Sequence, residues 1–327
     1  MRWALVALAT AACAVPLRAQ EPPRPEAALP DLPADAGLSL PGLHGEKTRA
    51  LAEALRAGAY DRAEKLLVEA GQGDGASPEL LRLLGGVSFL TGNYLNAAIA
   101  LKKAERLAPL DERGRFTLAM SYVVLGRHTW ARPELRALAE SAPANALYPY
   151  WMARLDYEAG LYADALASLR QAVAIDPRFV KAHDNLGLCY EALGRFQDAM
   201  ASHGRAVRLN REAASPSAWP PHNLGLLLTR SNQAAEAEPL FREALRYDAG
   251  FAPAHYQLGV TLEKMERTAE ATSALQEAAR LDPKYPDPHY ALARIHRRQG
   301  RLADADRALA AFQRLKNEKG KAPAPVR

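Results

Sequence analysis

The sequence repeats itself with a period of 34 residues, and this repetition limits the fold more than any other feature of the chain. Aligning Gly85, Gly187 and Gly259 and stepping by 34 divides the chain into eight frames, which are 44–77, 78–111, 112–145, 146–179, 180–217, 218–251, 252–285 and 286–319. The fifth frame carries four extra residues around 213–217. A unit this short cannot bury its own apolar face, so we expect neighbouring units to stack into a continuous core.

Several positions of the frame carry the same residue type along the chain, and their spacing predicts two helices in each frame. Apolar residues recur every three or four positions, as in Leu84, Val87 and Leu90, which is the helical period. Glycine ends the first half of six frames, where it caps a helix, and alanine is the twentieth residue of all eight, where a small side chain lets helices approach closely. These residues are Gly58, Gly92, Gly126, Gly160, Gly194 and Gly300, and Ala63, Ala97, Ala131, Ala165, Ala199, Ala237, Ala271 and Ala305. The pattern therefore predicts one helical hairpin per frame.

The fifth frame reads AHDNLGLCY over residues 182–190 and continues with Gly194, Phe196, Ala199 and Ala206. In these residues the chain resembles the tetratricopeptide repeat (TPR) family, and the resemblance extends over residues 44–319. It implies an all-α fold: an α-solenoid, a right-handed superhelix of about eight antiparallel helix pairs. It also implies a concave groove lined by the first helix of each pair.

Two departures from the family pattern predict local irregularity. His203 replaces the usual apolar residue of the second helix, and Gly204 follows it inside the same helix. A helix-interior glycine costs about 1 kcal/mol relative to alanine, so we expect a soft joint over residues 195–217. Pro133 and Pro239 hold equivalent places in their frames and are expected to delay or kink their helices.

Residues 1–19 have the character of a secretory signal peptide. Arg2 gives a positive start, an apolar run follows, and Ala19 is a small residue at the expected cleavage site. We therefore expect an exported protein of the bacterial periplasm or cell envelope. The segment Thr10–Cys13 (TAAC) also resembles a bacterial lipoprotein box, so lipidation of Cys13 remains an alternative to an ordinary cysteine within a signal peptide.

Short segments without repeats flank the solenoid. Residues 20–43 are rich in proline, which denies backbone donors to helices and sheets, so they are expected to form an extended linker. Residues 320–327 are expected to form a basic disordered tail.

Motifs for catalysis or cofactor binding are absent from the sequence. It contains no HExxH, no GxSxG, no phosphate-binding loop and no dinucleotide fingerprint, so we expect neither enzyme activity nor a cofactor. The histidines at the fourth position of three frames, His183, His255 and His289, would be held about 10 Å apart by stacked helices, too far for one metal ion. A net charge of +5, from 42 basic and 37 acidic residues, is too balanced to indicate a nucleic-acid partner.

The family resemblance implies which residues face the groove: usually the second, fifth, ninth, twelfth and thirteenth of each unit. Aromatic residues hold four of the eight fifth positions, although only 7% of the chain is aromatic. Tyrosine rings suit an extended peptide because they offer contact area and a hydrogen bond at small entropic cost, and arginine can hold a carboxylate. The predicted peptide-binding residues are Phe116, Tyr150, Arg154, Tyr157, Trp219, His222, Tyr256 and Tyr290. The alternative is that some of these rings pack between adjacent repeats.

The last frame is basic, and this charge has two interpretations. Its basic residues include Arg294, His296, Arg297, Arg298 and Arg301, and Lys316, Lys319 and Lys321 continue this charge toward the tail. They are expected either to meet an acidic partner or anionic lipid, or to form the solvated face of a capping repeat.

Together these features predict a non-catalytic scaffold or adaptor of the bacterial cell envelope that holds a protein or peptide in its groove. One alternative is a lipid-anchored assembly factor for outer-membrane or pilus machinery, which requires lipidation of Cys13. That anchor would be its only membrane contact. A second alternative is a glycan-binding module, because tyrosine-lined grooves also stack on sugars.

Overall fold

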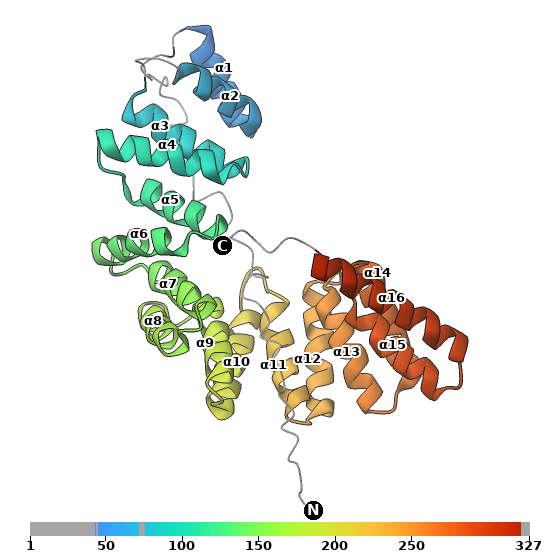
Figure 1. The fold of residues 1–327 in the computed structure, drawn as a ribbon. Coiled ribbons are helices and arrows are strands. Elements are labelled where there is room, and N and C mark those ends of the chain that lie inside the picture. The colour runs from blue at the N-terminus through green and yellow to red at the C-terminus, as the bar shows by residue number, and fades with distance from the viewer. Residues whose placement is uncertain (1–42, 44, 72–75, 322–327) are drawn as a thin grey trace, which may run out of the picture. The chain divides into compact units, whose positions relative to one another are not determined.

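The computed structural model describes residue 43, residues 45–71 and residues 76–321, with side chains up to residue 318. All sixteen regular elements in this part of the chain are α-helices, which confirms the predicted all-α fold (Figure 1). The predicted signal peptide, Cys13, the predicted linker up to residue 42 and residues 322–327 of the predicted tail lie outside the described residues. The chain divides into two compact units between Ile175 and Asp176, and each is described by itself.

The first unit contains four helical hairpins, which run from blue to green in Figure 1. Its helices are α1 (Glu46–Arg56), α2 (Tyr60–Ala70), α3 (Pro78–Leu90), α4 (Tyr94–Leu107), α5 (Glu112–Val124), α6 (His128–Ser141), α7 (Leu147–Glu158) and α8 (Tyr162–Ile175). Each of the first four sequence frames holds one pair. Leu51, Leu67 and Leu80 are fully buried between the first three helices and join one apolar core.

The second unit also contains four hairpins, drawn from yellow-green to red in Figure 1. Its helices are α9 (Val180–Ala192), α10 (Phe196–Arg211), α11 (Trp219–Arg230), α12 (Ala234–Tyr247), α13 (Ala252–Lys264), α14 (Thr268–Leu281), α15 (Asp287–Arg298) and α16 (Leu302–Lys321). Phe241, Leu275 and Ile295 are fully buried in one core that runs through the last three hairpins. Helix α16 continues two residues beyond the expected end of the last repeat at residue 319.

Small residues set the close packing of the two helices in each repeat. The alanines at the twentieth position, from Ala63 to Ala305, are at most 1% exposed. At the eighth position, a Cβ atom on Gly85 would lie 2.5 Å from Leu101, and one on Gly259 would lie 2.6 Å from Leu275. Because no ordinary contact is this short, these helices reach their separation only with glycine at the eighth position.

The turn inside each repeat requires a residue with positive φ. In six repeats this residue is glycine, with φ between 65° and 79°. Asn232 and Glu266 take the same place in the sixth and seventh repeats, with φ of 61° and 62°. The left-handed region costs most residues about 1–2 kcal/mol and asparagine less, so Glu266 carries strain that its glycine counterparts avoid.

The two predicted irregularities leave the helices continuous. Helix α6 begins at His128 and α12 at Ala234, so Pro133 and Pro239 lie inside their helices and do not delay them. Helix α10 continues through Gly204 to Arg211. The insertion that follows is held by the Asn210 side chain, which accepts a hydrogen bond from the Ser217 amide (2.8 Å) and donates one to the Ser217 carbonyl (2.9 Å).

Candidate functional site

The four predicted groove residues of the first unit are buried. They lie on α5 and α7, are 2% to 9% exposed, and are Phe116, Tyr150, Arg154 and Tyr157. The Phe116 ring packs on Tyr148 of the next repeat, with centroids 5.7 Å apart, and the Arg154 guanidinium lies 4.4 Å from the centre of the Trp151 ring. The exposure that we expected for these side chains is therefore wrong, because large neighbours cover them. Their contact with a ligand stays a prediction.

Trp219 and His222 of α11 pack on the aromatic residue that ends the sixth frame, Phe251. Their ring centroids lie 4.8 Å and 5.2 Å from that of Phe251, which immediately precedes α13. Burial, aided by the positive charge of Arg230, lowers the pKa of His222 to about 3. His222 is therefore a neutral, buried packing residue, and the expectation that it faces the groove is wrong. Trp219 is partly buried.

Tyr256 of α13 and Tyr290 of α15 are the two predicted tyrosines of the second unit. The Tyr256 ring is partly buried and packs edge-on against Tyr285, at 5.2 Å between centroids. Tyr290 is 50% exposed and rests on Phe312 of α16. Tyr290 is therefore the most exposed of the eight predicted groove residues.

Two arginines lie beyond Tyr290 on the same face of α15, one and two helical turns further along. Both bind the buried carboxylate of Glu263 in α13: Arg294 donates from Nε (3.0 Å) and from Nη2 (2.5 Å), and Arg298 donates from Nη2. Their side chains remain 48% and 57% exposed. The hydrogen bonds to Glu263 raise the pKa of Arg294, and the hydroxyls of Tyr256 and Tyr290 add a smaller effect. One carboxylate thus fixes two guanidinium groups beside an exposed tyrosine, and the cluster keeps a net positive charge.

The contact between Arg298 and the preceding repeat recurs at a spacing of 34 residues. Arg230 at the end of α11 donates to Glu191 of α9 (2.9 Å), and Lys264 at the end of α13 donates to the Thr229 carbonyl of α11 (3.0 Å). Each basic residue occupies the thirteenth position of its frame and reaches back to the repeat before it. All three side chains are exposed, and they lie one after another on α11, α13 and α15. We call this row of Arg230, Lys264 and Arg298 the basic ladder.

A second charged cluster is buried below the first rung of the ladder. His203 of α10 is fully buried, with Nδ1 2.8 Å from Asp184 and Nε2 3.0 Å from Glu191. Asn223 of α11 donates to the other Asp184 oxygen (2.9 Å). This His203 network joins α9, α10 and α11, and both ring nitrogens of His203 face a carboxylate oxygen.

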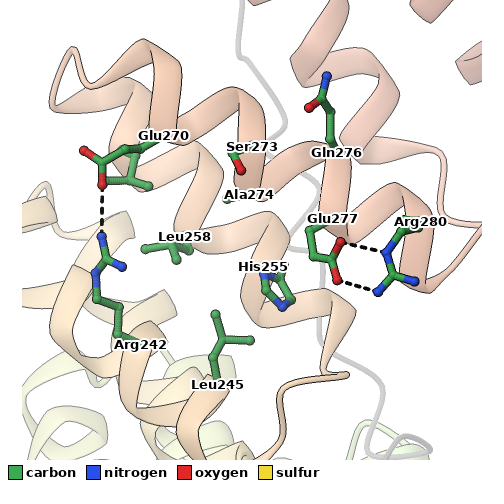
Figure 2. A pocket seen from close by; sticks show the side chains of 11 residues that line it. Arg242, Leu245, His255, Leu258, Glu270, Ser273, Ala274, Gln276, Glu277 and Arg280 are labelled. Carbon is green, nitrogen blue, oxygen red and sulfur yellow. Dashed lines mark hydrogen bonds and ion pairs between the residues drawn. The ribbon is translucent and has the colours of Figure 1, made fainter.

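A cleft of about 550 Å³ lies on a different face of α13, between α12 and α14. Its floor is apolar and is formed by Leu245, Leu258, Leu262 and Ala274. Figure 2 shows the rim, where Arg242 pairs with Glu270 and Arg280 pairs with Glu277 on opposite sides. These charges balance, so the cleft suits an apolar side chain better than a charged one.

The described residues contain neither a metal-ligand cluster nor a membrane-spanning helix. No three His, Cys, Asp or Glu side chains among them come together as metal ligands. His183 and His255 instead point back to the carbonyls of Pro177 (3.0 Å) and Ala249 (3.1 Å), each in the loop before its own helix. No helix within the same residues combines the length and apolar character that a bilayer span requires.

Comparison with known families identifies the fold. A family profile described as TPR repeat matches residues 153–194, and three described as tetratricopeptide repeat match 182–216, 222–286 and 262–318. The chain belongs to the tetratricopeptide repeat family, as the sequence predicts. No curated protein sequence matches it.

Several solved structures are similar in fold. PilW, described as a widely conserved type IV pilus biogenesis factor, is 21% identical with a TM-score of 0.56, over 62% of this chain and 92% of its own. The Cut9–Hcn1 hetero-tetramer of the APC/C is 15% identical with a TM-score of 0.59, over 76% of this chain and 48% of its own. MamA from Desulfovibrio magneticus RS-1 is 22% identical with a TM-score of 0.49, over 53% of this chain and 100% of its own. At these identities the likeness to PilW and to Cut9–Hcn1 shows the shared fold alone.

Two features of the second unit were not predicted from the sequence. The basic ladder was detectable, because its three basic residues hold one position in consecutive frames. The partners of His203 were not, because Asp184 and Glu191 approach it only after the helices pack.

Proposed function

We propose that the chain is a non-catalytic scaffold or adaptor that binds a protein or peptide on the first-helix face of its second unit. This face is formed by α9, α11, α13 and α15. The observation that carries the proposal is the exposed stripe Tyr290, Arg294 and Arg298 on α15, in which Glu263 fixes the two arginines and Phe312 supports the tyrosine ring. A tyrosine beside preorganised guanidinium groups is typical of protein-binding hot spots.

The buried charges of the second unit also favour a non-catalytic role. His203, Asp184 and Glu191 are the residue types of general acid–base catalysis, but catalysis requires contact with a substrate. His203 is 0% exposed and Asp184 is 1% exposed, so neither of these two side chains is open to a substrate. We therefore assign it to the stability of the fold.

Affinity capture from a bacterial envelope extract tests the proposal. The full chain is compared with a Tyr256→Ala, Tyr290→Ala double variant and with a Ser273→Ala, Gln276→Ala control in the cleft. Partners that are lost only with the tyrosine variant support binding on the first-helix face. Partners retained by that variant but lost with the control would assign the function to the cleft. Partners released by free oligosaccharides would instead favour the glycan-binding alternative.

The proposed location is the bacterial periplasm or cell envelope, and it rests on the signal-like sequence of residues 1–19. A lipid-anchored assembly factor is the second candidate function, since the TAAC sequence ending at Cys13 resembles a lipoprotein box. Metabolic labelling with a palmitate analogue separates the two. Label that is lost in Cys13→Ala supports the anchor, whereas an unlabelled, cleaved chain supports a periplasmic adaptor.

A further inference from the structure

The basic ladder indicates the chemistry of the ligand, and this inference rests on the proposed function. We propose that the first-helix face of the second unit binds an extended acidic peptide segment, with one carboxylate at each of Arg230, Lys264 and Arg298. Tyr256 and Tyr290 flank this row and supply the apolar contact between the charges.

The charge balance of the face supports an anionic ligand. Arg230, Lys264, Arg294 and Arg298 are exposed, whereas Glu191 and Glu263, the carboxylate partners of the three arginines, are largely buried beneath them. Glu191 also faces His203. Burial opposes the charge of His203, but the hydrogen bonds to Asp184 and Glu191 outweigh it and raise the pKa of His203 to about 9, and Asp184 offsets the resulting charge. The surface that a ligand meets is therefore positive.

The geometry of the guanidinium groups also suits a carboxylate. Arg294 binds Glu263 through Nε and Nη2, and Arg298 binds the same carboxylate through one Nη2 contact. Among the described residues, Glu263 is the only acidic partner of either arginine. Each guanidinium has five N–H donors, so donors on the outer edge remain for a second carboxylate held in a fixed orientation.

The spacing of the ladder favours an extended peptide over other anions. Helices α11, α13 and α15 contact one another in this order, and packed helices lie about 8–10 Å apart. An extended polyproline II chain has three residues per turn and advances about 3.1 Å per residue. Acidic side chains three residues apart therefore share one face of such a peptide, about 9 Å apart, and match successive rungs. The headgroups of a lipid surface have no such regular spacing, so a lipid-binding face would not need its basic residues arranged in a row along the stacked helices.

Fluorescence anisotropy with synthetic peptides tests the proposal on the full chain. The probe is a labelled twelve-residue Ser/Ala/Tyr peptide with Asp at every third position, and its isomer carries the same Asp residues in one block. Two double variants remove equal charge: Lys264→Gln, Arg298→Gln on the ladder, and Arg280→Gln, Arg307→Gln as the control. Each control arginine pairs with a neighbour three residues away on its own helix, away from the ladder. Circular dichroism confirms that both variants fold.

We expect the spaced peptide to bind, to weaken about tenfold in the ladder variant and to be unchanged in the control. Raised salt should weaken binding further because exposed charges are screened. Equal losses in both variants, or equal binding of the blocked isomer, would overturn the proposal. Phosphatidylglycerol vesicles provide a second comparison. If they bind through Lys264 and Arg298 while the peptide does not, the face binds lipid and the proposal of a peptide ligand is overturned.

The proposed function and this inference fail separately. If no acidic peptide binds while envelope partners are still lost with Tyr256→Ala, Tyr290→Ala, the acidic ligand is wrong and the scaffold function stands. If the spaced peptide binds through the ladder while no envelope partner depends on the tyrosines, the acidic-ligand site stands and the scaffold function fails.

Discussion

The imidazole of His203 in α10 lies 2.8 Å from the carboxylate of Asp184 in α9, at a position where other repeats bury an apolar side chain. The corresponding residues are Leu101, Phe241 and Leu275, each packed on the glycine of the first helix. Burial alone lowers the pKa of His203, but the hydrogen bonds and charges of Asp184 and Glu191 outweigh it and raise this pKa to about 9. An ionic contact therefore joins the two helices of the fifth repeat, at a position where other repeats join their helices by apolar packing.

The raised pKa of His203 predicts that stability depends on pH. The folded-state pKa of about 9 exceeds the ordinary histidine pKa of 6.5, so the folded chain binds the proton more tightly than the unfolded chain does. This stabilisation is complete below about pH 6.5 and is lost as the pH rises through 9, by about 3 kcal/mol in total. Urea unfolding at pH 6.5 and pH 9 measures the change, and His203→Gln should abolish it over this window. A wild-type chain that is equally stable at both values would contradict the assignment.

Alanine substitution at two glycines of the fifth repeat should change the stability of the fold in opposite directions. A Cβ on Gly187 would lie 2.4 Å from the His203 ring, so Gly187→Ala is expected to destabilise the fold by about 1–3 kcal/mol. A Cβ on Gly204 meets only Arg208, at 3.9 Å, so Gly204→Ala should stabilise α10 by about 1 kcal/mol. Thermal unfolding of the two single variants checks this, and effects of the same sign would contradict the packing described here.

Glu266 offers a stabilising substitution in the seventh repeat. Its φ of 62° suits glycine, so Glu266→Gly should raise stability by about 0.5–1 kcal/mol after the greater freedom of glycine in the unfolded chain is subtracted. Gly300→Ala, at the same place in the last repeat with φ of 75°, should lower stability and serves as the control. Denaturant midpoints measure both changes, and a loss of stability in Glu266→Gly would show that this turn is not strained.

Hydrogen exchange over residues 195–217 distinguishes the structure from the sequence expectation of a soft joint. The His203 network and the Asn210–Ser217 hydrogen bonds hold this segment on both sides. We expect α10 amides to exchange as slowly as those of α12 and α14. Markedly faster exchange in α10 would show that Gly204 and the insertion loosen the joint after all.

The repeat architecture could be predicted from the sequence because its causes are local and periodic. Ala63 and its seven counterparts are buried as their spacing requires, and glycines such as Gly58 have the predicted positive φ. The exposure of individual groove residues could not be predicted in this way. Tyr150 and Tyr290 share one frame position, yet one is 2% and the other 50% exposed, because exposure depends on the neighbouring side chains. The same holds for His222, which Trp219 and Phe251 enclose.

Photo-crosslinking in the bacterial envelope tests the central claim, that the first-helix face of the second unit binds a protein ligand, most directly. A photoreactive phenylalanine analogue replaces Tyr290, which is 50% exposed beside Arg294, and in a control it replaces Ser273 in the cleft. We predict a discrete protein adduct from position 290, whose yield falls in the Lys264→Gln, Arg298→Gln variant. We predict no adduct of the same mass from position 273. An adduct from position 273 alone would contradict the account, and so would an adduct from position 290 whose yield is unchanged by the ladder substitutions.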